Sequence, residues 1–301
     1  MAILCTNQTR VLIQGITGNA GRLACEQMLA SDTVVAAGVT PGKGGQLVQG
    51  VPVYNTIHEA LVSHPELNTS LIVVPPLAAK AAALEAFAAG IQLVVCLTEN
   101  IPMHDTAAMI AKARASRCRL VGPASIGIAS PGFGRIGPIG GPQEQYEKLY
   151  VKGSIGVIST SGGMTNETAW VVRQAGFGQS TVVGIGGEAI IGTTFADVLA
   201  LFEADENTKA VVLFGEIGGS YEKEIAELIK AKAFTKPLIA FIAGAFAEQL
   251  PRNIQFGHAA AVISHNTGAQ SAKVKILEDA GVHVVRHHHD IGKRLHEVLH
   301  I

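Results

Sequence analysis

The chain has 301 residues, which is enough for two domains of ordinary size, each with its own core. Its 23 basic and 24 acidic side chains nearly balance, so neither a nucleic-acid partner nor a charged membrane surface is expected. Hydrophobic residues make up 48% of the chain, but no uncharged apolar stretch reaches the roughly 18 to 20 residues of a bilayer crossing, so buried strands are expected instead.

The amino terminus lacks a basic segment followed by an apolar core, so we expect no export signal. Cysteines at positions 5, 25, 96 and 118 show neither CxxC spacing nor a paired framework, a pattern typical of reduced thiols. Together these features favour a cytoplasmic protein.

Short β-branched runs alternate with alanine-rich helical stretches in the first part of the chain. Near-continuous apolar runs that end at Gly or Pro are typical of parallel strands covered on both faces. A helical pattern such as residues 77–89 lies between such runs, and this βαβ succession predicts an α/β domain with an open, doubly wound sheet over residues 1–130. The predicted strands are residues 10–14, 34–39, 70–74, 92–97 and 119–121.

A glycine-rich turn joins the first predicted strand to the first helix. It reads Gly15-Ile16-Thr17-Gly18-Asn19-Ala20-Gly21, a GxxGxxG spacing rather than GxGxxG. Amides at such a helix start bind phosphate oxygens, although tight packing of helix on strand explains the glycines equally well.

The end of the second predicted strand discriminates between ligands. A nicotinamide enzyme usually carries an acidic residue about 20 residues after the glycine turn. This chain has Lys43 in a glycine loop there, which suits a ligand with an extra phosphate, such as coenzyme A or NADP. A solvated loop lysine is an equally good interpretation.

The periodicity fails between residues 122 and 150, where Gly and Pro become frequent, and we place a linker at residues 131–150. A second parallel sheet is predicted over residues 151–301, with strands at 154–159, 181–185, 210–214, 237–242, 259–263 and 282–285. Its predicted helices are residues 165–174, 196–203, 221–230, 269–280 and 291–299. We interpret the three histidines at 287–289 as a solvated turn.

Three features of the second domain suggest a site for an anion. Ser161-Gly162-Gly163 opens a predicted helix, where amides and the helix dipole attract negative charge, with Asn166 close by. The structural alternative is a capping box completed by Glu167. Glu216 follows an apolar run in the glycine turn 215–219, and His258 lies in a glycine-flanked loop.

A histidine oriented by a carboxylate keeps one ring nitrogen free to attack, as a phosphoryl carrier requires. A lone histidine is more often structural, but the flanking glycines leave room for a ligand. Because carboxyl ends of neighbouring parallel strands meet at one rim, we expect the Ser161 turn, Glu216 and His258 to lie together.

These segments resemble the α subunit of succinyl-CoA synthetase over essentially the whole chain. The likeness is carried by residues 38–45, 184–187, 215–219 and 256–259. It implies a Rossmann-like CoA-binding domain followed by a flavodoxin-like ligase domain, and a partner β subunit of ATP-grasp fold that holds ATP or GTP with Mg²⁺. It further implies that His258 is the phosphohistidine, that Glu216 orients it, and that coenzyme A contacts Thr17, Gly18, Asn19, Ala20, Gly21, Lys43, Val74, Pro75, Thr98 and Glu99.

The acid substrate is less well defined by the resemblance. Succinate is the default, but Thr160 and Asn166 replace an Arg and a Tyr of the succinyl enzymes, and residues 122–127 also depart from their pattern. These replacements look more like the ligase module of ATP-citrate lyase and citryl-CoA synthetase, so citrate or another hydroxy acid is the alternative.

Two other classes stay open on the residues alone. An NADP-dependent oxidoreductase is favoured only by the glycine turn and Lys43. A non-catalytic CoA-binding sensor would need neither His258 nor Glu216, and the full second domain favours an enzyme.

Overall fold

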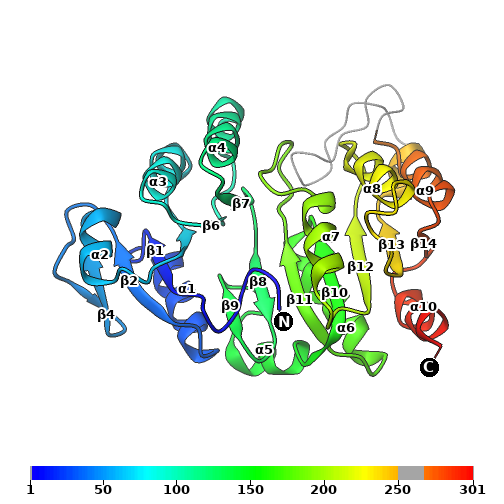
Figure 1. The fold of residues 1–301 in the computed structure, drawn as a ribbon, viewed down its shortest axis with the longest axis horizontal. Coiled ribbons are helices and arrows are strands. Elements are labelled where there is room, and N and C mark those ends of the chain that lie inside the picture. Colours follow the sequence, from blue (N-terminus) through cyan, green and yellow to red (C-terminus); the bar gives the residue numbers. More distant parts are fainter. Residues whose placement is uncertain (1, 250–267, 301) are drawn as a thin grey trace.

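The computed structural model describes residues 2–249 and 268–300. Over these residues the chain forms two α/β units, each built on a seven-stranded sheet with helices on both faces (Figure 1). The amino-terminal unit occupies the blue-to-cyan half of the view, and the carboxyl-terminal unit the green-to-red half.

The first sheet has the strand order β3-β4-β2-β1-β5-β6-β7. Its parallel strands are β4 (Val51–Tyr54), β2 (Val35–Val39), β1 (Val11–Gln14), β5 (Thr69–Ile72), β6 (Leu93–Cys96) and β7 (Arg119–Val121). Five of them confirm the predicted strands. The short β3 (Leu47–Val48) pairs antiparallel with β4, and neither was predicted, because a two-residue strand and a strand containing Pro52 carry no sustained apolar run.

Alternate residues of these strands pack on opposite faces of the sheet. Val11, Ile13 and Leu71 pack with residues of α1 (Asn19–Ala30). Leu12 and Ile72 belong to the core formed with α2 (Ile57–Ser63), α3 (Pro76–Ala88) and α4 (Met103–Ala115). Helices on both faces explain why these strands are apolar throughout, and they confirm the Rossmann-like arrangement.

The second sheet has the order β14-β13-β12-β10-β11-β8-β9. Its five parallel strands are β10 (Lys152–Ser159), β11 (Gln179–Gly184), β12 (Ala210–Gly215), β13 (Leu238–Ile242) and β14 (His283–Val284). In chain order they lie 2-1-3-4-5 across the sheet, which is the flavodoxin-like order. The predicted strand at 259–263 lies outside the described residues.

Helices cover both faces of the second sheet as well. On one side α5 (Gln143–Leu149), α6 (Gly162–Gln174) and α10 (Asp290–Leu299) contribute to one core. On the other side α7 (Phe195–Ala204), α8 (Tyr221–Lys230) and α9 (Gln270–Asp279) pack with residues of the first unit in a continuous core, and the short 3-10 helix η1 (Ala245–Gln249) precedes residue 250. The two units are therefore packed together rather than loosely tethered.

The glycine-rich segment between the two units is structured. Residues 127–136 form β8 (Gly127–Ser130) and β9 (Gly134–Ile136), antiparallel strands of the second sheet, so elements of that sheet begin before the predicted boundary at 130. The predicted linker at 131–150 contains β9 and α5. Its glycines allow tight turns: Gly132, Gly137 and Gly140 all have positive φ.

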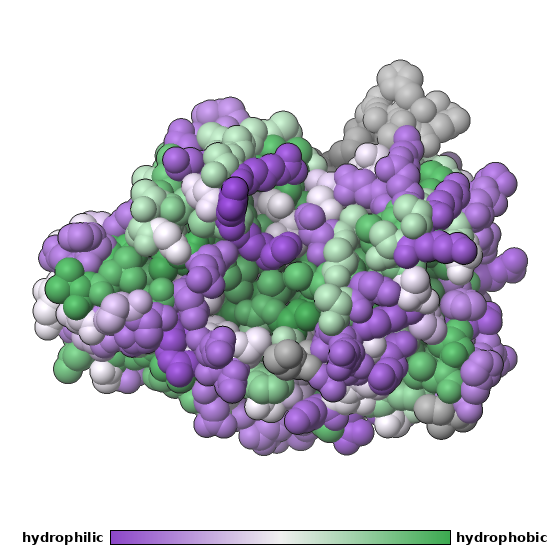
Figure 2. Space-filling view, in the orientation of Figure 1, coloured by the Kyte–Doolittle hydropathy of each residue, from purple (hydrophilic) through white to green (hydrophobic). Residues whose placement is uncertain are grey.

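Among the described residues, no helix combines the length and the apolar character that crossing a bilayer would require. In the space-filling view, hydrophilic residues cover much of the periphery and hydrophobic ones gather in a hollow near the centre of the face (Figure 2).

Candidate functional site

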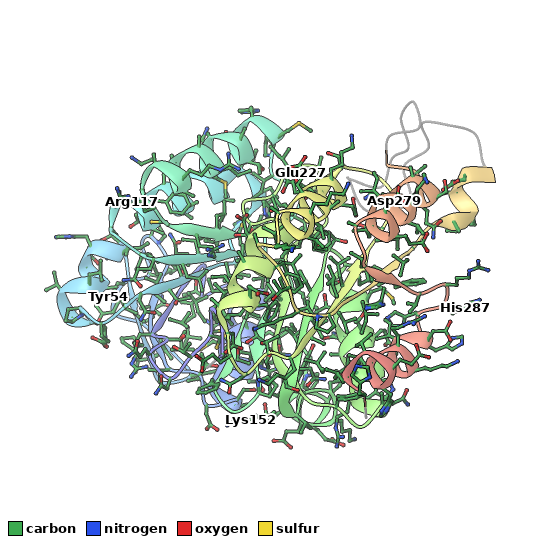
Figure 3. The ribbon with its side chains drawn as sticks, turned by 45° about the vertical axis from the view of Figure 1, so that its right-hand side comes forward. Tyr54, Arg117, Lys152, Glu227, Asp279 and His287 are labelled. Carbon is green, nitrogen blue, oxygen red and sulfur yellow. The ribbon has the colours of Figure 1, made fainter. Side chains whose placement is uncertain are left out.

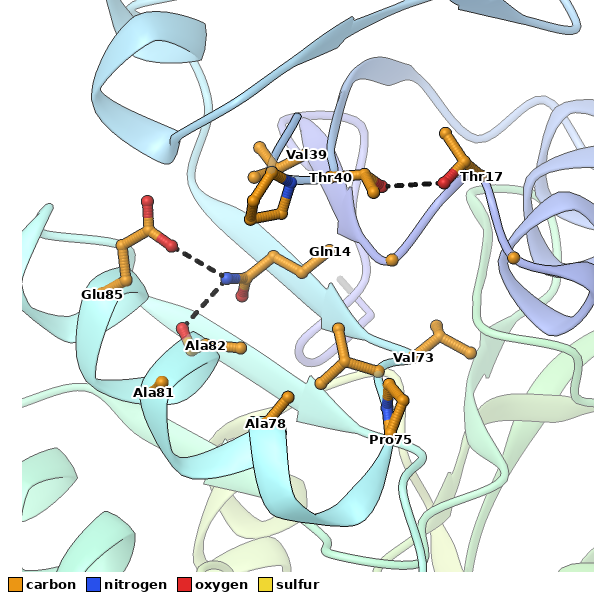
Figure 4. A pocket seen from close by; sticks show the side chains of 14 residues that line it. Gln14, Thr17, Val39, Thr40, Val73, Pro75, Ala78, Ala81, Ala82 and Glu85 are labelled. Carbon is orange, nitrogen blue, oxygen red and sulfur yellow. Dashed lines mark hydrogen bonds between the residues drawn. The ribbon is translucent and has the colours of Figure 1, made fainter. Parts of the chain in front are cut away.

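A cavity of about 450 Å³ opens where β1, β2 and β5 end (Figure 4). The turns that follow these three strands and one side of α3 form its wall, which is mostly apolar. Doubly wound sheets bind ligands in this position, beyond the carboxyl ends of their strands. The residues that line it include Gly15, Thr17, Gly18, Thr40, Pro41, Val74, Pro75, Ala78 and Ala81.

Two polar side chains, Gln14 and Glu85, were not predicted and lie at this cavity (Figure 4). Gln14 Nε2 donates to the carbonyl of Ala82 at 3.0 Å and to Glu85 Oε2 at 3.5 Å, and Gln14 Oε1 accepts from Ser70 Oγ at 2.9 Å. Glu85 Oε1 accepts from the amide of Ile57 at 2.7 Å. These hydrogen bonds fix both side chains. In the sequence, Gln14 could have been recognised as a candidate because it is a polar residue at the end of an otherwise apolar strand.

The glycines of the turn after β1 have different surroundings. Gly15 has a φ of +89°, and a Cβ there would lie 2.5 Å from the carbonyl oxygen of Val73. A Cβ on Gly21 would lie 2.3 Å from the carbonyl oxygen of Gly15, so Gly21 serves the packing of helix on strand. Gly18, Asn19 and Ala20 are exposed at the start of α1, which has no side-chain cap. The packing interpretation is confirmed at Gly21, and phosphate binding at the exposed helix start stays a prediction.

The predicted coenzyme A residues divide into two groups. Thr17, Gly18, Val74 and Pro75 line the cavity. Thr17 Oγ1 also donates to Thr40 Oγ1 at 3.2 Å, joining the turns after β1 and β2. The other predicted residues, Asn19, Ala20, Gly21, Lys43, Thr98 and Glu99, are not among those that line it.

Lys43 is exposed in a loop beside the cavity residues Thr40 and Pro41. The loop is held by Asn55, whose Oδ1 accepts from the amides of Gly42 and Gly44 at 2.9 and 3.1 Å. Its main chain is therefore defined, while the lysine head group is in solvent.

Turns that follow strands of both sheets meet at the seam between the units. Thr98 Oγ1 donates to the carbonyl of Val74 at 2.8 Å, and the amide of Asn100 donates to Glu188 Oε1 at 2.8 Å. Further along, the amide of Gly192 donates to the carbonyl of Gly122 at 2.9 Å. The turn after β11 is thus bonded to the turns after β6 and β7.

The second predicted helix start has the expected form. Ser161 is the N-cap of α6, and its Oγ accepts from the amide of Met164, while its own amide donates to Ser159 Oγ at 3.0 Å. Gly163 is exposed, and a Cβ there would meet no atom within 4 Å. Glu167 is exposed and takes no part in the cap, so the cap is Ser161 alone. The first turn of α6 contains no acidic residue, which favours an anion there.

Two neighbours of this turn differ in their hydrogen bonding. Thr160 Oγ1 is buried without a hydrogen-bond partner within the described structure. Asn166 Oδ1 accepts from Tyr150 Oη at 2.6 Å and from the amide of Gly140 at 3.2 Å. The carboxamide oxygen of Asn166 is therefore occupied by residues 140–150. A contact between Asn166 and the substrate stays a prediction, and its amide nitrogen would make that contact.

Glu216 lies next to the Ser161 turn at the same end of the second sheet. β10 and β12 are adjacent parallel strands in which Ser159 is level with Phe214, so the turns after both strands share one rim. Glu216 is half-buried, directly beyond Gly215. Two of the three predicted features are therefore brought together, and His258 lies outside the described residues.

The described thiols are poor nucleophiles. Burial raises the pKa of Cys96, at the end of β6, to about 12, and that of Cys25 to about 11. Burial raises the pKa of the Cys5 thiol as well. These side chains stay protonated at neutral pH, which favours other groups for nucleophilic chemistry.

Metal-ligating side chains gather at one place among the described residues. His287, His289 and Asp290 have ligand atoms within 4.8 Å of one another. His287 is at the outer edge of the second unit (Figure 3), and His287 and His289 are largely exposed, as the predicted solvated turn requires. His288 between them is half-buried, because its ring packs against Phe214 and Phe241, so the prediction is wrong for that residue. This group lies at the start of α10, apart from the turns described above.

Known protein families match both units of the chain. Residues 6–100 match the CoA binding domain, and residues 158–285 match the CoA-ligase domain. The chain is 46% identical over 299 residues to the ADP-forming succinate–CoA ligase subunit alpha 1 of Archaeoglobus fulgidus, with 99% of each chain covered. It is 39% identical to the ADP-forming sulfoacetate–CoA ligase subunit SqwL of an Acholeplasma species, covering 99% of this chain and 98% of that one.

A solved structure has the same fold over nearly the full chain. It is that of ATP citrate lyase from Methanothrix soehngenii in complex with citrate and coenzyme A, with a TM-score of 0.90 and 28% sequence identity. The alignment covers 98% of this chain and 50% of the lyase chain, so the present chain spans about half the length of that protein.

Proposed function

The chain belongs to the family of succinate–CoA ligase α subunits, and on that premise we propose that it is the α subunit of an ADP-forming acid–CoA ligase. The names of the relatives as α subunits imply a β subunit, and we assign to that partner an ATP-grasp fold that binds ATP with Mg²⁺. ATP is preferred to GTP here because the relatives are named ADP-forming.

The cavity beyond β1, β2 and β5 is the observation that carries this proposal. It combines an apolar wall with a glycine turn that leads into the uncapped start of α1, which suits a ligand with an apolar part and phosphates. Coenzyme A has both. Lys43 lies in the loop beside Pro41, where its ammonium group can reach an additional phosphate of the bound ligand.

The rim of the second sheet supports a phosphoryl-transfer site. The half-buried Gly162 and the exposed Gly163 begin a 13-residue helix, and main-chain amides at such a start stabilise a phosphoryl group in place of water. Glu216, on the adjacent strand end, accepts the N–H of the His258 imidazole, which fixes the tautomer and stabilises the cationic ring.

The reaction that follows has three steps. The free ring nitrogen of His258 attacks the γ-phosphorus of ATP, and the bond to the β-phosphate oxygen breaks to release ADP. A carboxylate oxygen of the acid then takes the phosphoryl group, which yields an acyl phosphate and free histidine. The coenzyme A thiolate attacks the acyl carbon and expels inorganic phosphate, leaving the acyl-CoA.

Succinate is the acid that we propose first, because the relatives named for it are up to 46% identical to this chain. Citrate is the second candidate. It is favoured by the fold shared with the citrate-bound lyase, and by Thr160 and Asn166, which stand where the succinyl enzymes carry an Arg and a Tyr and so leave room for a larger acid. Sulfoacetate enters as a third substrate because a 39% identical relative is named for it.

Co-expression with the β subunit tests the proposal. The complex is incubated with γ-labelled ATP, and label on this chain is followed before and after addition of coenzyme A and one acid. We expect label on the wild-type chain, no label on His258→Asn, and discharge by coenzyme A with a single acid among succinate, malate, citrate and sulfoacetate. Label retained by His258→Asn would refute the phosphohistidine, and discharge by citrate alone would replace succinate.

A further inference from the structure

Helices α8 and α9 lie side by side in the second unit, where Glu227 and Asp279 mark them in Figure 3. A buried ion pair joins them. Nζ of Lys273, on α9, is 2.9 Å from the carboxylate of Glu222, in the first turn of α8. The two residues are 5% and 1% exposed, so the pair is withdrawn from water.

Lys273 makes a second hydrogen bond that leads to the candidate site. Its Nζ donates to the main-chain carbonyl oxygen of Glu216 at 2.8 Å. Glu216 follows β12 directly, so a side chain from α9 holds the turn that carries the proposed partner of the histidine. Lys273 is 57 residues from Glu216 and 51 residues from Glu222 in the sequence, so no local sequence pattern indicates these contacts.

A main-chain contact supports the same turn from the same side. The amide of Gly218 donates to the carbonyl of Gly268 at 2.8 Å. Gly268 has a φ of +82°, and a Cβ there would lie 2.6 Å from Gly218 Cα, so glycine is required for this approach. Gly268 is also the first described residue after 250–267, the segment that contains His258.

The charges fit a positioning role better than a stabilising one. Burial raises the pKa of Glu222, the negative charge of Glu216 raises it further, and Lys273 opposes both. Lys273 thus balances the charge of Glu222, while the Glu216 carboxylate repels it. A buried ion pair contributes little net stability compared with an apolar pair of the same size, which makes geometry the better explanation for its presence.

The turn also has space into which it could move. A cavity of about 210 Å³ lies against it, lined by Gly219 and Ser220 on one side and by Ala272 and Lys273 on the other. Lys273 therefore both lines this cavity and donates to the carbonyl of Glu216.

We propose that Lys273 is a positioning residue for phosphoryl transfer, which fixes the Glu216 turn through its carbonyl while Glu222 balances the lysine charge. The inference rests on the proposed function. Displacement of a reacting partner by about 1 Å can lower a rate by about a hundredfold. Loss of this hydrogen bond should therefore slow phosphorylation without weakening the binding of coenzyme A, which we place in the other unit.

The test uses the complex with the β subunit and three variants. Lys273→Met removes the donor, and the double variant Lys273→Met/Glu222→Gln removes it without leaving a buried carboxylate unpaired. Lys275→Met, on the exposed side of the same helix, is the matched control. The measurements are the rate of label uptake from γ-labelled ATP, its pH profile, the KM for coenzyme A and the melting temperature.

We expect the double variant to melt close to wild type and to take up label at least tenfold more slowly, with an unchanged KM for coenzyme A. Its acid limb should move to lower pH, because an imidazole that loses its carboxylate partner binds a proton less tightly. Wild-type uptake and pH profile in the double variant would overturn the inference, and so would a rise in KM equal to the loss in rate. Failure of the wild-type chain to take up label would instead refute the proposed function itself.

Discussion

Filling the cavity of the first unit gives the sharpest test of where coenzyme A binds. Ala78 lies on α3 with its methyl group at the cavity wall, and it is exposed, so the fold does not depend on its packing. Tryptophan at this position would project a bicyclic ring into the cavity of about 450 Å³. A tryptophan side chain covers about 150 to 250 Å² of surface, a large part of what a ligand needs there.

We expect Ala78→Trp to raise the KM for coenzyme A at least tenfold, which corresponds to about 1.4 kcal/mol or more of lost binding. The kcat should change less than threefold, because the reacting groups are in the other unit and the lost interaction is made equally in the ground state and the transition state. The cost to the helix itself is about 0.5 kcal/mol. Steady-state kinetics at varied coenzyme A concentration, with the β subunit present, measure both constants.

Ala108→Trp is the matched control, since Ala108 is exposed on α4 and does not line the cavity. Its KM for coenzyme A should equal that of the wild type. If Ala78→Trp also binds coenzyme A with wild-type affinity in calorimetry, this cavity is not the coenzyme A site, and the reasoning from the strand ends fails.

Three further changes have expected outcomes that the structure defines. Arg135→Met should lower the free energy of unfolding in urea by about 3 kcal/mol. The fully buried guanidinium donates to main-chain carbonyls of both units at 2.8 and 2.9 Å, and each lost partner costs about 1 to 3 kcal/mol. For the control Arg114→Met, on the exposed end of α4, the free energy of unfolding should stay within about 0.5 kcal/mol of wild type. Gly15→Ala should abolish coenzyme A binding or folding, because its Cβ would lie 2.5 Å from a carbonyl oxygen, and a soluble variant with normal binding would contradict this. Burial lowers the pKa of His288 below its ordinary 6.5. The neutral ring therefore contributes stability that is present above pH 6.5 and is lost as the pH falls through the lowered pKa. The melting temperature of His288→Gln should thus depend less on pH, between about pH 7 and pH 5, than that of the wild type.

The sequence predicted the elements that are buried on both faces and missed those at the edges. β1, β5 and β6 are apolar throughout because helices cover both sides of the sheet, and that pattern is visible without a structure. The hairpin of β8 and β9 looked like a linker, because Gly127 and Gly134 interrupt the apolar pattern. In the structure both have positive φ and pack closely, with a Cβ at Gly127 falling 2.1 Å from the carbonyl oxygen of Ile136.

From local patterns alone, the candidate site was indicated where a motif and a strand end coincide, while Val74 and Pro75 came from the family resemblance. Thr17 and Gly18 satisfy both conditions, and so does Ser161. Gln14, Glu85 and Lys273 act through tertiary contacts across 51 to 71 residues of sequence, and their residue types alone are ordinary in a strand or a helix. Long-range hydrogen bonds of this kind are set by how the units pack, which no local pattern encodes.

The seam between the units explains how two distant sites can serve one reaction. In the reaction that we propose, coenzyme A in the first unit delivers its sulfur to an acyl phosphate formed at the rim of the second. Carboxyl ends of strands from both sheets converge at this seam, where Asn100 is bonded to Glu188 and Thr193 Oγ1 donates to the carbonyl of Leu120 at 2.7 Å. Because the continuous apolar core also crosses the seam, the distance between the two sites is fixed by packing rather than by a linker.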